Sequence, residues 1–144
     1  MAKARTTLVV LLPPYPEKAV GKAGLAPGMT WRRKVHAAIK QAAELSKVDT
    51  YPAGTEIECT VRLALQRPRL NVQDVDNLLK HVFDALQGRL GGSKSRAPRW
   101  QLVPNDYQIR KVVVEKVPAP QRKYGSRLAV RKYTRGRRSK TRPS

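Results

Sequence analysis

The sequence is poor in the residues that form disulfides or bind soft metals. Cys59 is the only cysteine, and His36 and His81 are the only histidines. A single chain therefore builds neither a disulfide framework nor a zinc ribbon. No apolar run approaches the roughly 20 residues of a membrane-spanning helix. The run at residues 8–12 is also shorter than the roughly 7–15 apolar residues of a secretion signal. We therefore expect a reduced, cytoplasmic protein with no membrane association.

Negative charge is scarce as well. The 144 residues include 10 Asp and Glu against 30 Lys and Arg, which gives a net charge of +20. A surface this basic favours a polyanionic partner, either DNA or RNA. With 40% hydrophobic residues, the chain is too apolar for a disordered polycation. Composition alone does not separate an enzyme from a ribosomal or packaging protein.

The hydrophobic pattern predicts a small α/β fold of the mixed α+β kind. Strands are expected at residues 8–12, 56–66, 107–117 and 126–133, and the two main helices at 31–46 and 75–86. These elements fit one domain at residues 1–133, with a mixed sheet of about four strands packed by two helices. Residues 134–144 are basic without any acid, which predicts a disordered tail.

Individual residues mark the boundaries and faces of these elements. Thr30 is a suitable N-cap for the first helix, whose apolar stripe runs from Trp31 to Leu45. The strand at 8–12 is apolar throughout, which predicts burial. Gly88 is a natural stop for the second helix. The strand at 56–66 alternates, and its apolar side consists of Ile57, Cys59, Val61, Leu63 and Leu65.

The few acidic residues are unevenly placed. Asp74, Asp76 and Asp84 fall within one short stretch, and Asp106 follows a loop. Asp74 lies at or just before the second helix, where extended chain points residues two apart to the same side. Lys80 lies one turn after Asp76 and on the same side of that helix. Asp84 lies eight residues after Asp76, a rise of about 12 Å, so the two can hardly bind one ion.

Each of these residues also has an ordinary structural interpretation. Asp74 suits a helix N-cap, and Asp106 suits a turn. Asp76 and Lys80 suit a surface pair one helical turn apart. Their gathering in a basic chain is more informative, because carboxylates on a DNA-binding surface repel phosphate. A divalent cation between the carboxylates and the phosphate removes that conflict.

Three short motifs carry a family resemblance. They are Asp74-Val75-Asp76-Asn77-Leu78-Leu79-Lys80, Phe83-Asp84-Ala85-Leu86 and Asn105-Asp106-Tyr107-Gln108-Ile109. Together they resemble the RusA family of Holliday-junction resolvases. The likeness covers about residues 7–133, with Leu11-Leu12-Pro13-Pro14 similar to the family's opening strand and proline pair. A RusA-like fold in a bacterial or phage-encoded protein is what this resemblance implies.

The resemblance also implies roles for individual residues. Asp74, Asp76 and Asp106 would bind Mg²⁺ or Mn²⁺ as catalytic carboxylates, and Lys80 would be the catalytic lysine. Asp84 matches a family position too, but its distance along the helix favours a supporting role.

Two features depart from the family pattern. Asn105 stands where the family has the first of two acidic residues, while Asp106 aligns with the family's third aspartate. The segment at 89–103 is longer than expected. It is either a solvated insertion or a loop that contacts the DNA junction beside the site. The junction contacts in the second alternative are Arg96, Arg99 and Trp100.

The function implied by the resemblance is hydrolysis of DNA. A homodimeric, Mg²⁺- or Mn²⁺-dependent endodeoxyribonuclease would resolve four-way junctions by paired symmetric nicks during recombination and repair. Basic residues, including Arg135, Arg137 and Arg138 of the tail, would bind the junction arms without reading sequence. The alternative is a non-catalytic, basic nucleic-acid-binding protein, either ribosome-associated or junction-binding. It explains the charge of +20 equally well but gives no reason for the aspartates to gather.

Overall fold

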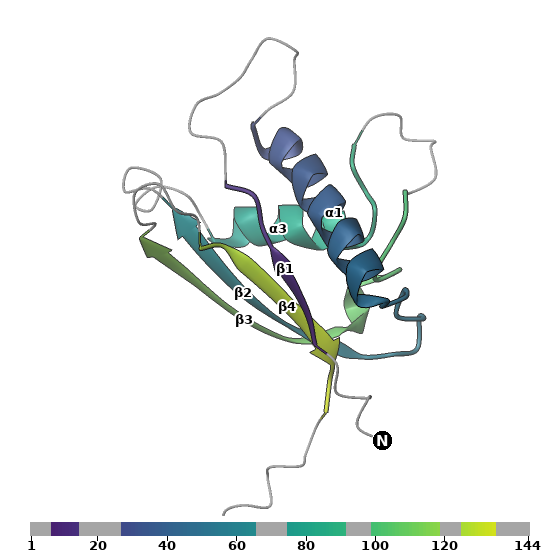
Figure 1. Ribbon diagram of the computed structural model, residues 1–144. Helices are drawn as coiled ribbons and strands as arrows, with labels where there is room; N and C mark the ends of the chain where they lie inside the picture. The colour runs from purple at the N-terminus through teal and green to yellow at the C-terminus, as the bar shows by residue number, and fades with distance from the viewer. Residues whose placement is uncertain (1–6, 15–26, 66–74, 92–98, 119–124, 135–144) are drawn as a thin grey trace, which may run out of the picture.

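The fold combines a four-stranded sheet with two helices, in a computed structural model that describes residues 7–14, 27–65, 75–91, 99–118 and 125–134 (Figure 1). The predicted class, a small mixed α/β fold, is confirmed. None of the described helices is both long and apolar enough to cross a membrane. In chain order the described elements are β1 (Leu8–Leu11), α1 (Pro27–Ser46), β2 (Ile57–Leu65), α3 (Val75–Leu86), the 3₁₀ helix η2 (Asp106–Gln108), β3 (Ile109–Pro118) and β4 (Arg127–Lys132).

The sheet is mixed, and its one parallel pair places the chain's two motif segments. The strand order is β1-β4-β2-β3, with β2 and β3 parallel and the other two neighbouring pairs antiparallel. A parallel pair needs a crossover connection, and α3 lies in the chain between β2 and β3. This arrangement brings α3 against β3, so the motif on the helix and the motif before the strand occupy one part of the molecule.

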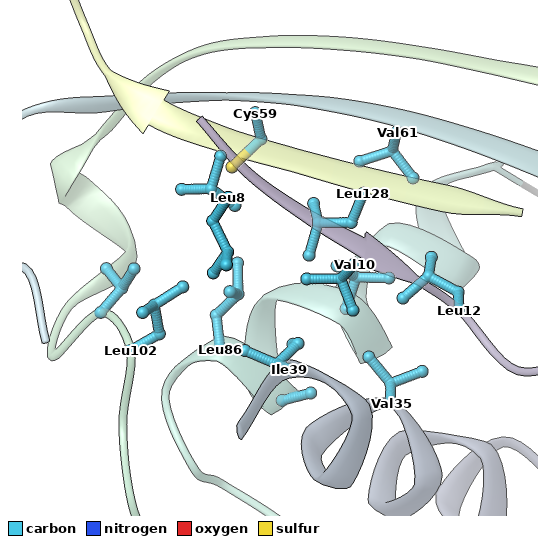
Figure 2. Packing of buried hydrophobic residues seen from close by; sticks show 14 of the residues in the cluster. Leu8, Val10, Leu12, Val35, Ile39, Cys59, Val61, Leu86, Leu102 and Leu128 are labelled. Atoms are coloured by element: carbon cyan, nitrogen blue, oxygen red, sulfur yellow. The ribbon is translucent and has the colours of Figure 1, made fainter. Parts of the chain in front are cut away.

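Both helices cover the same face of the sheet, and the hydrophobic core lies between them and the strands (Figure 1). In Figure 2 the side chains of Val10 and Leu128 point toward Val35 and Ile39 of α1. All four of these residues are buried. The predicted inward face of β2 is confirmed, because the buried set includes Ile57, Cys59, Val61, Leu63 and Leu65.

Strand β1 differs from the prediction of full burial. It lies at one edge of the sheet, and only the face toward the helices is covered. Leu8 and Val10 are buried on that face, whereas Val9 is 49% exposed and Leu11 is 75% exposed on the other. An apolar run indicates burial on both faces only where a layer covers each face, and the described residues provide one layer.

Helix α1 begins earlier than predicted. Thr30 is not its N-cap, because the helix already includes Pro27. Proline suits the first helical position, where its missing N–H would have no partner inside the helix. At the other end, Leu45 is 77% exposed, and Ala43 is buried in its place. Ala43 continues the spacing of four residues that starts at Trp31, which keeps it on the core side of the helix.

The end of α3 is closed by a segment that the pattern predicted as loop. Residues 99–103 lie against the last turn of the helix, whose carbonyl groups lack partners within the helix. Leu102 and Val103 are fully buried there. The Arg99 N–H donates to the carbonyl of Gly88, and the N–H groups of Leu102 and Val103 both donate to the carbonyl of Leu86. The side-chain amide of Gln101 donates to the carbonyl of Gln87.

Gly88 is the predicted stop of α3, and the structure confirms it. Its φ of 72° lies in the left-handed region, which residues with a side chain rarely adopt. A Cβ atom there would also lie against the carbonyl oxygen of Arg99 and 2.8 Å from that of Trp100. The close approach of the closing segment therefore depends on glycine at this position.

Gly88→Ala should lower the free energy of unfolding by at least about 2 kcal/mol, because left-handed strain alone costs about 1–2 kcal/mol. Urea unfolding followed by circular dichroism measures the change. Gly54→Ala is the matched control, since a Cβ atom at Gly54 meets nothing within 4 Å. Equal unfolding midpoints for the two variants would contradict the packing described for Gly88.

Candidate functional site

An open pocket of about 380 Å³ lies beside α3 and the start of η2. It brings together charged residues from two distant parts of the sequence, three on the helix and one just before β3. The predicted site residues Asp76, Lys80 and Asp106 are all among them. The lining residues are Asp76, Leu79, Lys80, Phe83, Asp84 and Asp106.

The periodicity of α3 explains why its polar residues share the pocket. Leu78, Val82, Ala85 and Leu86 form the buried face of the helix. Residues three, four, seven and eight positions after Asp76 return to the same side of a helix. Four of the lining residues occupy those positions. One helix therefore carries two faces, one toward the core and one toward the pocket.

Asp106 reaches the pocket from the first position of η2. Asn105 before it has extended backbone, with φ of −138° and ψ of 137°. The turn is closed by the Gln108 N–H, which donates to the carbonyl of Asn105 at 3.1 Å, and by the Ile109 N–H, which donates to that of Asp106. The expected strand start at Tyr107 is therefore wrong by two residues, because this turn precedes the ladder.

Asn105, which departs from the family pattern, is not among the residues that line the pocket. Its side-chain Nδ2 donates to the Tyr107 hydroxyl at 3.3 Å in an exposed position. At this position the chain thus has an amide that contacts its own turn. Asp106 keeps its place at the pocket.

Asp84 is engaged by two cations. Its Oδ2 lies 3.0 Å from Nη2 of Arg32 on α1 and 3.9 Å from Nζ of Lys80. The Arg32 side chain is only 10% exposed, so this ion pair is shielded from water and ties α3 to α1. The Lys80 side chain is 65% exposed, and its longer contact with Asp84 is weak. The Lys80 ammonium group therefore stays accessible from the pocket.

Arg32 also contacts His81, one of the buried residues of α3. Its Nε donates to His81 Nδ1 at 3.1 Å, and its Nη1 donates to the carbonyl of Arg89 at 3.2 Å. Burial lowers the pKa of His81, and the positive charge of Arg32 lowers it further. The ring is therefore neutral near pH 7, with its proton on Nε2, because Nδ1 accepts a hydrogen bond. This contact was not predicted from the sequence, because an arginine is usually exposed.

The pocket offers oxygen ligands of the kind that Mg²⁺ and Mn²⁺ prefer. Asp76 and Asp106 are exposed and take part in none of the ion pairs between described residues. Asp74, the third predicted ligand, lies outside the described residues. Within the described ranges, no group of three His, Cys, Asp or Glu residues is placed to hold a metal. The described part of the site thus contributes two carboxylates that fit a hard divalent cation.

The residues predicted to contact DNA are only partly described. Arg96, Arg135, Arg137 and Arg138 lie outside the described residues, and Arg99 is exposed. Trp100 is partly buried against the core, with its ring centroid 6.2 Å from that of His36. Its carbonyl oxygen lies 2.8 Å from Nε2 of the same histidine. For residues 99–103 the interpretation as a solvated insertion is therefore wrong, and contact of Arg99 and Trp100 with DNA stays a prediction.

Comparison of the chain with protein-family models and with curated proteins returns no match. The family resemblance therefore depends on the motif residues themselves.

The neutral His81 predicts how stability responds to acid. Its folded-state pKa lies below the ordinary value of 6.5, so the unfolded chain takes up this proton first as the pH falls. The free energy of unfolding should therefore decrease below about pH 6.5 and level off once the folded protein is also protonated. His81→Asn keeps an acceptor for Arg32 but does not titrate, so its unfolding midpoint in urea should depend less on pH. Equal pH dependence of both proteins between pH 7.5 and 5 would contradict the assignment.

Proposed function

We propose that this chain is a metal-dependent endodeoxyribonuclease that acts on four-way DNA junctions. The observation that carries the proposal is the shared pocket of Asp76, Lys80 and Asp106, which come from two separate motifs. The net charge of +20 supports a nucleic-acid substrate. The resemblance of the same motifs to RusA resolvases supports the choice of branched DNA.

Each residue has a distinct role in this proposal. Asp76 and Asp106, together with Asp74, would hold Mg²⁺ or Mn²⁺. When bound, the ion supplies positive charge and lowers the pKa of water for attack on a phosphodiester. Lys80 would place its exposed ammonium group beside the phosphate oxygens and stabilise the charge that develops on them. The abundant Lys and Arg residues of the chain would bind the junction arms through their phosphates.

A junction-binding protein without nuclease activity is the competing function. Asn105 favours it, because the family pattern has a carboxylate at this position. A synthetic mobile four-way junction, labelled in turn on each strand and incubated with Mg²⁺ or with EDTA, separates the two functions. The proposed nuclease should make paired nicks in two strands of like polarity, only with the metal, and should leave linear duplex intact. Tight junction binding without nicks would establish the competing function.

Asp76→Asn should lower the nicking rate by more than about 100-fold, since even residues that only orient metal ligands contribute about 10–100-fold. Junction affinity should be unchanged or higher, because the substitution removes a charge that repels phosphate. Rates from denaturing gels and affinities from fluorescence anisotropy give both quantities. Asp49→Asn makes the same change at an exposed carboxylate outside the pocket and should behave as wild type. Full Mg²⁺-dependent nicking by Asp76→Asn would refute the site.

The proposal also includes a homodimer. Resolution of a junction requires two symmetric nicks, and the described part of each chain offers one pocket with Asp76 and Asp106. A dimer with two-fold symmetry matches the approximate symmetry of the junction. Light scattering of the complex should therefore show two chains per junction. Mixed dimers of wild type and Asp76→Asn should nick one strand and rarely complete resolution. Paired cuts by a monomer would contradict this arrangement.

A further inference from the structure

The side chain of Gln108 is buried at the amino end of β3, with 2% of its surface exposed. Its Nε2 donates to the carbonyl oxygens of Pro52 at 2.8 Å, Thr55 at 2.9 Å and Tyr51 at 3.4 Å. Its Oε1 accepts from the N–H of Asn105 at 3.1 Å. The amide has two hydrogens for three acceptors, so its donor capacity is fully used.

These hydrogen bonds act where regular strand pairing is interrupted. The register between β2 and β3 shifts between Ile57 and Glu58, at the first residues of the ladder. The turn at 51–55 and η2 both lie upstream of that shift. The Gln108 amide joins these two segments through side-chain hydrogen bonds instead of a ladder.

Asp106 lies within the turn that this amide holds. The Gln108 side chain accepts a hydrogen bond from the N–H of Asn105, the residue directly before Asp106. It donates its other hydrogen bonds to the turn at 51–55. The Asp106 side chain itself takes part in none of the ion pairs between described residues. The place of its carboxylate therefore depends on the main chain of η2.

We propose that Gln108 is a positioning residue that fixes the Asp106 carboxylate at the pocket. The consequence for metal and catalysis rests on the proposed function, whereas the consequence for the main chain of η2 does not. Gln108 does not line the pocket, so it would act only through Asp106.

The test compares Gln108→Met with Thr50→Val. Methionine keeps the length of the side chain and removes both donors. Thr50→Val removes a nearby hydrogen bond of another kind, from Thr50 Oγ1 to the Gln101 carbonyl at 2.6 Å, and leaves the Gln108 amide in place. Each protein is measured about 20 °C below its own melting temperature, so that all of them are folded. Should Gln108→Met fail to fold, Gln108→Asn retains a shorter amide and takes its place.

Binding of Mn²⁺ alone, measured by calorimetry, reports whether the Asp106 carboxylate is in place to bind the ion. Gln108→Met should bind about 10–100-fold more weakly, as expected when a residue that orients a metal ligand is lost. Asp106→Asn should weaken binding at least as much, and Thr50→Val should bind as wild type. The Mg²⁺-dependent nicking rate should fall in parallel, with unchanged junction affinity in EDTA. Wild-type Mn²⁺ affinity in Gln108→Met would overturn the proposal.

Amide hydrogen exchange gives a measurement that needs neither metal nor DNA. The Ile109 N–H donates to the Asp106 carbonyl, so its exchange reports whether η2 stays closed. It should exchange about 10-fold faster in Gln108→Met than in Thr50→Val, the effect of about one net hydrogen bond. Equal exchange in the two variants would overturn the positioning role. If wild type neither binds Mn²⁺ nor nicks, the proposed function fails, and this exchange still decides the role of Gln108.

Discussion

Strands β2 and β3 run parallel, so the chain that leaves the far end of β2 must return before β3 can begin. Helix α3 lies in that return and is packed against the sheet, which commits one side of it to the core. The side that remains carries Asp76 and Lys80. The same return ends in the turn that carries Asp106. The parallel pairing of two strands thus decides that these residues meet, although the sequence separates them.

The buried guanidinium of Arg32 holds helix α1 to helix α3. A charge removed from water is destabilising unless hydrogen bonds and an opposite charge compensate it. Arg32 has three such partners, the carboxylate of Asp84, Nδ1 of His81 and the carbonyl of Arg89. Loss of any one would leave a buried polar group without its partner. The register of α1 on α3 is therefore specified by directional contacts as well as by apolar packing.

The elements with a regular period could be predicted, and those that depend on tertiary partners could not. The alternation of β2 and the helical period of α3 are properties of the local sequence, and both predictions are confirmed. The half-exposed β1 and the turn at η2 depend on which face is covered and where a ladder begins. Burial of the polar residues Arg32 and Gln108 was not predicted from the sequence, because it follows from partners far away in the chain. Asp76, Lys80 and Asp106 share a pocket as the motifs suggested, whereas Asp74 lies outside the described residues.

The distribution of charge gives the pocket its chemical character. Glu56, Glu58 and Asp84 each contact an arginine at 2.7–3.0 Å, as expected where cations are abundant. Asp76 and Asp106 share a pocket yet take part in no ion pair between described residues. With Asp84 neutralised by its arginine, these two carboxylates and the Lys80 ammonium carry a net formal charge of about −1, which repels a phosphodiester. A divalent cation would offset this negative charge and place a positive centre beside the phosphate. The proposed metal dependence therefore explains why a strongly basic protein places two carboxylates in one pocket with no ion pair to another described residue.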